Sequence, residues 1–105
     1  MAKFMLTYLG GEHPTDPEEG KKHFEEYRQW LTSLGDAVIS AANPLKDTHT
    51  IGPDGKAKEG SSTMMSGFSV LEAPSIEAAV LMSESCPFLK IGGRLEVSEL
   101  IEMPL

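Results

Sequence analysis

His23 is the residue of this 105-residue chain whose side chain is best suited to move a proton near neutral pH. An imidazole beside a carboxylate can act as a general acid or a general base. Acidic residues that could orient it include Glu12, Asp16 and Asp36. We therefore take His23, Glu12 and Asp36 as candidate catalytic residues for a proton transfer. A solvated histidine on a helix surface is the alternative.

Other aromatic and polar side chains could bind a ligand. Tyr27 and Trp30 could line a pocket, although aromatic residues at helical spacing are more often part of a core. His13 and His49 lie on expected loops, where functional residues concentrate, but a lone loop histidine is commonly only solvated. We keep Tyr27, Trp30 and His49 as candidate ligand-binding residues.

Arg94 is the fourth candidate ligand-binding residue. It follows Gly92-Gly93 at the start of the last expected strand, where its guanidinium could bind an anion at the mouth of a cavity. A salt bridge to Glu72 or Glu96 is the alternative. The glycine pair is not a phosphate-binding loop, because no Lys-Ser/Thr follows it and it leads into a strand.

The chain lacks the usual signatures of metal and thiol chemistry. The three histidines form neither an HxH nor an HExxH motif, so we expect no metal site, and no motif indicates a cofactor. Cys86 is the one cysteine, which excludes a disulfide within the chain and fits a reducing cytoplasm, where we expect the protein to be located. Its expected place at a helix C-terminus disfavours a thiolate, so we interpret it as a structural thiol rather than a nucleophile.

Composition excludes two classes of partner. Nine Lys and Arg residues against sixteen Asp and Glu residues give a formal net charge of −7. Nonspecific binding to nucleic acid and docking on anionic lipid both need a cationic surface, so we expect neither. No segment approaches the ~20 apolar residues of a membrane-spanning helix. The length fits a single domain over residues 1–105, and a domain this small gains stability from forming an oligomer.

Apolar periodicity predicts the element order β-α-β-β-α-β. The expected strands cover residues 3–9, 37–42, 63–72 and 94–103, and residues 49–60 form a polar hairpin loop. Asp16 followed by Pro17 marks the start of the first helix and Gly35 its end. Ser75 caps the second helix, which ends before Pro87.

The first helix carries an apolar stripe formed by Phe24, Tyr27, Leu31 and Leu34, with Trp30 beside it. Two helices cover only one face of a four-stranded sheet, and the opposite face would leave a large apolar patch on a monomer. We therefore expect a ferredoxin-like α+β domain that pairs sheet to sheet as a homodimer. Such a dimeric α+β barrel can enclose a cavity for a small molecule.

Several segments resemble the YCII-related family, also called DGPF-domain proteins, and together they span nearly the whole chain: residues 30–37, 43–45, 67–73, 78–79, 86–87 and 92–97. The resemblance implies a dimeric α+β barrel but no known reaction. In short family members, a histidine on the first helix has been proposed to pair with an aspartate after the first strand. Here His23 is the histidine on that helix, and Glu12 and Asp16 are the nearby acids. Residues 59–62, Glu-Gly-Ser-Ser, stand where the family has Asp-Gly-Pro-Phe.

Three functions remain open at this point. The first is a small-molecule-binding dimeric barrel acting as a cofactor-independent enzyme through a His–carboxylate pair. The second is a non-catalytic ligand sensor or accessory module, because proteins resembling this family sometimes occur near or fused to transcription regulators. A purely structural oligomer is the third and least favoured.

Overall fold

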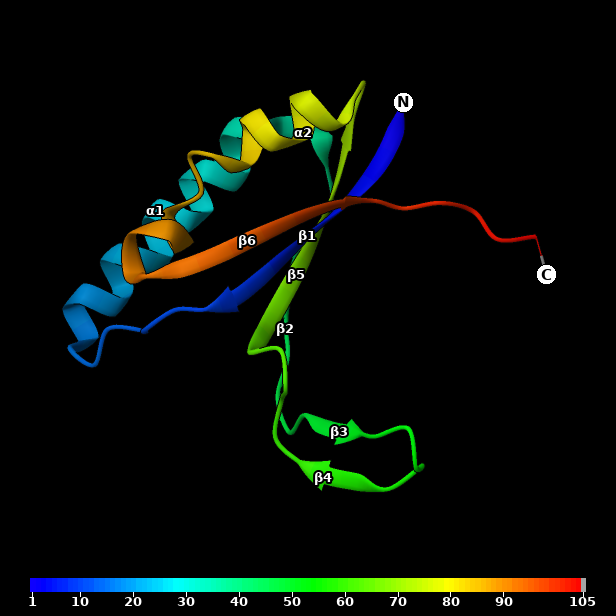
Figure 1. Cartoon of the computed structure of the whole chain (residues 1–105). Coiled ribbons are helices and arrows are strands. Elements are labelled where there is room, and N and C mark those ends of the chain that lie inside the picture. The colour runs from blue at the N-terminus through cyan, green and yellow to red at the C-terminus, as the bar shows by residue number, and fades with distance from the viewer. Residues whose placement is uncertain (105) are drawn as a thin grey trace.

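A computed structural model describes residues 1–104 of the chain. Its elements are β1 (Ala2–Gly10), α1 (Pro17–Leu34), β2 (Val38–Pro44), β3 (His49–Ile51), β4 (Ala57–Glu59), β5 (Met65–Ala73), α2 (Ile76–Ser83) and β6 (Gly93–Glu99), with short 3-10 helices at Gly35–Ala37 and Pro87–Ile91. One antiparallel sheet has the strand order β2-β5-β1-β6, and both helices lie on one of its faces (Figure 1). The predicted ferredoxin-like α+β fold is confirmed.

Side-chain caps fix the start of each long helix. Asp16 Oδ1 accepts a hydrogen bond from the backbone N–H of Glu18 at 3.0 Å, and Pro17 occupies the first turn. Ser75 Oγ accepts from the backbone N–H of Ala78 at 3.1 Å. These bonds satisfy amides that have no partner within the helix, and each cap stabilises its helix by about 1 kcal/mol. Both N-caps agree with the prediction.

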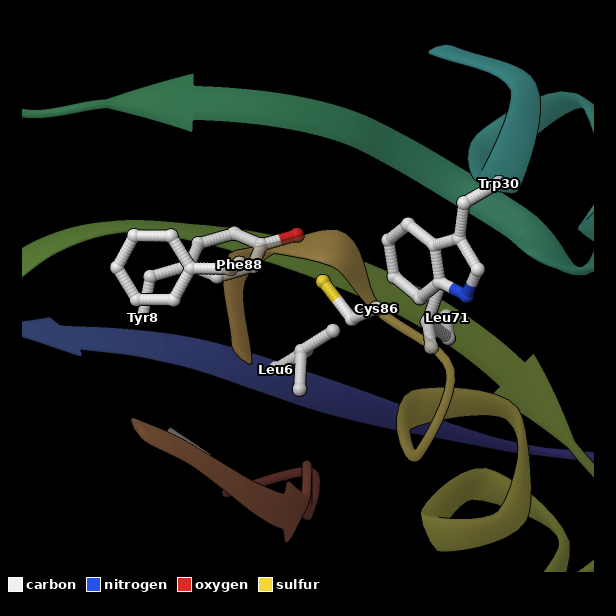
Figure 2. Close-up of a cluster of buried hydrophobic side chains, with 6 residues drawn as sticks. All are labelled: Leu6, Tyr8, Trp30, Leu71, Cys86 and Phe88. Carbon is white, nitrogen blue, oxygen red and sulfur yellow. The ribbon is translucent and has the colours of Figure 1, made fainter. Parts of the chain in front are cut away.

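The core lies between the sheet and the two helices. Its main cluster consists of Leu6, Tyr8, Trp30, Leu71, Cys86 and Phe88 (Figure 2). Tyr8 and Leu6 belong to the face of β1 that alternation turns toward the helices. The indole N–H of Trp30 donates to the carbonyl of Met82 at 3.1 Å and so ties α1 to the end of α2.

Three strand boundaries differ from the prediction by two or more residues. β6 ends at Glu99 rather than at residue 103, because Glu99 already pairs with Phe4 near the beginning of β1. β2 continues through residues 43–44 instead of being interrupted there, since a proline is tolerated on the edge strand of a sheet. β5 begins at Met65 because Met64 has a φ of 63°.

Phe24 does not join the core, so the predicted apolar stripe on the first helix is wrong at this position. Its side chain is 61% exposed, whereas Trp30 is buried. Further along α1, Tyr27, Leu31 and Leu34 pack against the main cluster as expected. The difference arises because a pocket separates the first turns of α1 from the sheet.

The sheet face opposite the helices is uncovered in the single chain. In the register of the sheet, Met5 lies beside Val70 and Ser98, and Thr7 lies beside Phe68 and Glu96. Met5 and Val70 are half-buried. This mixed apolar and polar surface is the face for which the sequence predicts a second subunit.

Strands β3 and β4 form the hairpin expected between residues 49 and 60. Its turn is closed by the N–H of Gly52 donating to Lys56 at 3.0 Å and by the N–H of Gly55 donating to Gly52 at 2.9 Å. The hairpin projects away from the four-stranded sheet (Figure 1). Ile51 on it is 69% exposed.

Candidate functional site

A pocket of about 350 Å³ lies between the first turns of α1 and the sheet, where β1 and β2 end and β5 begins. Aromatic side chains dominate its wall: Tyr8, Phe24, Tyr27 and Phe88. The remaining lining includes two histidines, His13 and His23. An aromatic hollow with few polar groups suits a small, flat and largely apolar ligand.

The two histidines of the pocket come from adjacent segments. His13 belongs to the segment between β1 and α1, and His23 lies two turns into α1. Their rings meet edge to face with centroids 6.4 Å apart, and the ring of His13 also lies 6.5 Å from that of Phe88. His23 is half-buried, whereas His13 is exposed. The pair therefore places two imidazoles on a largely apolar wall.

Three hydroxyl groups meet beneath the pocket. The hydroxyl of Tyr8 lies 2.7 Å from that of Tyr27 and 2.6 Å from Ser69 Oγ, and Ser69 in turn donates to the carbonyl of Ala41. Tyr8 and Ser69 are buried. Burial raises the pKa of Tyr8 above its ordinary value, so this phenol keeps its proton at any physiological pH.

The candidate carboxylates do not lie beside His23. The backbone N–H of Glu12 donates to Ile91 at 2.8 Å, and Glu12 lines a second hollow rather than the aromatic pocket. Asp36 follows the far end of α1, about 20 Å from His23 at a rise of 1.5 Å per residue. Within residues 1–104, the ion pairs are Arg28–Glu25 and Lys90–Glu26, and neither involves a histidine.

The four candidate ligand-binding residues occupy different places. Tyr27 lines the aromatic pocket together with His23. Trp30 lies in the core, and His49 is exposed on the hairpin, where its Nδ1 is 2.9 Å from the carbonyl oxygen of Asp47. Arg94 lines the second hollow with Glu12. The structure thus brings together one candidate catalytic residue, His23, and one candidate ligand-binding residue, Tyr27.

Tyr8, Ser69 and Phe88 were missed by sequence reasoning. A signal for the first two does exist, because each places a hydroxyl on a strand face that otherwise carries apolar or small side chains. A hydroxyl buried on such a face needs a partner, and hydroxyls on neighbouring strands can supply one. Phe88 carries no comparable signal, since its place depends on the short helix that follows α2.

Cys86 lies in the core and not at the pocket. It is 2% exposed and packs in the main cluster (Figure 2). Burial raises the pKa of its thiol to about 11. The side chain therefore remains a thiol near neutral pH, in line with the structural interpretation.

Two further searches of residues 1–104 bear on function. No group of three or more His, Cys, Asp or Glu side chains is arranged to hold a metal ion. Among the helices of this part of the chain, none combines the length and the apolar character needed to cross a membrane.

Comparison with known proteins gives a likeness in fold. No family model matches the chain, and no curated protein matches it significantly. A solved structure similar to the chain is that of 5-chloro-2-hydroxyhydroquinone dehydrochlorinase from Burkholderia phenoliruptrix AC1100 in complex with 2,5-dihydroxybenzoquinone. The two share 19% sequence identity over 95% of each chain with a TM-score of 0.57. At this identity the likeness concerns the fold alone.

Proposed function

We propose that this chain binds a small, flat, oxygen-substituted ring compound in the aromatic pocket between α1 and the sheet. The observation that carries the proposal is the wall of four aromatic side chains with His13 and His23 among them. Aromatic faces stack on a planar ring, and the imidazoles can bind its oxygen substituents. The dehydrochlorinase of similar fold was solved with a dihydroxybenzoquinone, which has this chemical character.

In the proposed reaction, His23 transfers a proton to and from a ring carbon of the bound compound without a cofactor. It is favoured over His13 because it is half-buried on a helix, which holds the imidazole in one place. One C–H bond breaks as another forms, and the proton passes through the imidazole, so no oxidant or reductant is needed. His13 lies at the edge of the His23 ring and positions it.

The proposal includes membership of the YCII-related family and a homodimer that joins the two open sheet faces. Residue patterns over most of the chain and the uncovered face around Met5 and Val70 support it. A dimer would remove this face from water and make the assembly a dimeric α+β barrel. In this view the protein acts in the cytoplasm.

A second function is ligand sensing without chemistry. One observation favours it: the candidate carboxylates Glu12 and Asp36 lie away from His23, so neither of these two is in place to orient its imidazole. A sensor needs the pocket but not the proton transfer.

Hydrogen–deuterium exchange separates the two functions. The ring C–H groups of 2,5-dihydroxybenzoquinone can exchange with D₂O through a carbon-protonated tautomer, which proton NMR follows directly. We expect catalysed exchange with the wild-type protein, a loss of about 100-fold in rate in His23→Gln and unchanged affinity. His49→Gln, a change at an exposed histidine outside the pocket, is the matched control and should retain the full rate.

If the compound binds but its exchange is not catalysed, the result supports ligand sensing and contradicts the proposed proton transfer. Absence of saturable binding of this compound at millimolar concentration would contradict both functions as stated for this ligand class.

A further inference from the structure

The hydrogen bonds beneath the pocket can run in only one direction. The chain of contacts ends at the backbone carbonyl of Ala41, which can accept a hydrogen bond but cannot donate one. Ser69 Oγ therefore donates its one proton to Ala41. Toward every other neighbour, the Ser69 oxygen can only accept.

This first bond fixes the next two. Oxygens 2.6 Å apart need a proton between them, so the hydroxyl of Tyr8 donates to Ser69. The hydroxyl of Tyr27 then donates to Tyr8 at 2.7 Å, because the Tyr8 proton is already used. A longer contact of 3.4 Å between Tyr27 and Ser69 draws on the same Tyr27 proton and leaves the direction unchanged.

Burial makes this direction costly to reverse. Ser69 is 0% exposed and Tyr8 is 6% exposed, so water cannot take over a broken bond. If the hydrogen bonds ran in the opposite direction, the lone pairs of Ser69 Oγ and of the Ala41 carbonyl oxygen would face each other. Such an unsatisfied buried contact costs more than the bond itself contributes.

We infer that Tyr27 presents its phenolic oxygen to the pocket as a hydrogen-bond acceptor only. Tyr27 is half-buried and lines the pocket, whereas Ser69 does not, so Tyr27 is the pocket-side end of the chain. The site therefore selects a ring that carries a hydroxyl or N–H at this point over the same ring with a carbonyl. This inference rests on the proposed function, since it specifies which oxygen substituents the bound ring carries.

A nearly isosteric pair of probes tests the inference. 1-Indanol can donate a hydrogen bond, whereas 1-indanone can only accept, and both fit a pocket of about 350 Å³. Isothermal titration with the wild-type protein should show 1-indanol binding about 10-fold more tightly, the difference expected between a satisfied and an unsatisfied contact.

Ser69→Ala tests the direction of these hydrogen bonds by a change at a residue that does not line the pocket. Without Ser69 the Tyr8 proton can turn to Tyr27, which frees the Tyr27 proton to donate to a ligand. We expect tighter binding of 1-indanone and a ratio of the two affinities near 1. Phe24→Leu, a change in an apolar part of the pocket wall, is the matched control and should alter both affinities while keeping their ratio.

The possible failures are distinct. If both probes bind wild-type protein with equal affinity, or if 1-indanone binds more tightly, the inference is overturned while ligand binding stands. A wild-type ratio that persists in folded Ser69→Ala also overturns it. If neither probe binds, the proposed function fails and the inference fails with it. Should Ser69→Ala not fold, the wild-type ratio decides the question alone.

Discussion

The aromatic ring of Phe88 lies directly against the backbone of Gly93. A Cβ atom added at Gly93 would come within 2.2 Å of Phe88 Cε2, far closer than atoms in contact can approach. Phe88 also meets Tyr8 edge to face with ring centroids 5.3 Å apart, and both rings line the pocket. The absence of a side chain at Gly93 therefore sets the position of one wall of the pocket.

Gly93→Ala should destabilise the protein and weaken ligand binding together. The added methyl group forces Phe88 to move, and overpacking of this kind typically costs about 1–3 kcal/mol. Urea unfolding measures the loss, and titration with 2,5-dihydroxybenzoquinone measures the effect on the pocket. Gly20→Ala is the matched control for stability alone, because Gly20 also lines the pocket; its added Cβ meets nothing within 4 Å, and the change should raise stability by up to about 1 kcal/mol. Unchanged stability in Gly93→Ala would show that the ring of Phe88 can shift freely.

Val70→Asp should convert the proposed homodimer to a monomer. Val70 lies at the middle of the open sheet face, beside Met5 of β1 and Ser40 of β2. A charge buried there without a partner would disfavour sheet-to-sheet pairing. Light scattering should give about twice the chain mass of 11.4 kDa for the wild-type protein and the single mass for the variant. Gln29→Asp, on the exposed side of α1, should remain dimeric. A monomeric wild-type protein would contradict the dimer directly.

The thiol of Cys86 should make stability fall at alkaline pH. Burial raises its pKa from 9.0 to about 11, so above pH 9 the unfolded chain loses this proton before the folded chain does. The stabilisation is complete below about pH 9 and is lost as the pH rises toward 11, a change of about 2–3 kcal/mol. Urea unfolding at several pH values measures it.

Cys86→Ala provides the comparison, since it lowers stability at every pH but lacks this alkaline dependence. The difference between the two proteins should therefore shrink from pH 8 to pH 11. In a second measurement, a thiol-specific reagent should label the wild-type protein slowly under native conditions and rapidly in urea. A parallel pH dependence of both proteins would contradict the role of the thiol.

The parts of the fold that could be predicted are those that neighbouring residues determine. Asp16 and Ser75 indicate where the helices begin, because the side chain of each accepts a hydrogen bond from a backbone amide two or three positions further along. The strands follow from alternation, and the hairpin follows from its turn residues. Predicted boundaries were wrong where a distant partner decides them, as at Glu99, which already pairs with Phe4 near the beginning of β1.

The site could be predicted only in part, because its contacts join residues far apart in the sequence. Tyr8 meets Tyr27 and Ser69 at separations of 19 and 61 residues. The register of β1 and β5 brings Ser69 close to Tyr8, and the packing of α1 on the sheet brings Tyr27 there. Sequence proximity was misleading in the opposite sense for Glu12, which lies eleven positions from His23. The backbone bond from Glu12 to Ile91 directs it to a different hollow.

The hairpin of β3 and β4 should unfold separately from the four-stranded sheet and at a lower free-energy cost. Its strands contact chiefly each other, and a two-stranded hairpin alone is marginally stable in water. We expect its amide protons to exchange with solvent well before those of β1 and β5, which form the centre of the sheet. The four-stranded sheet thus sets global unfolding, while the hairpin is an arm whose folding is a local equilibrium.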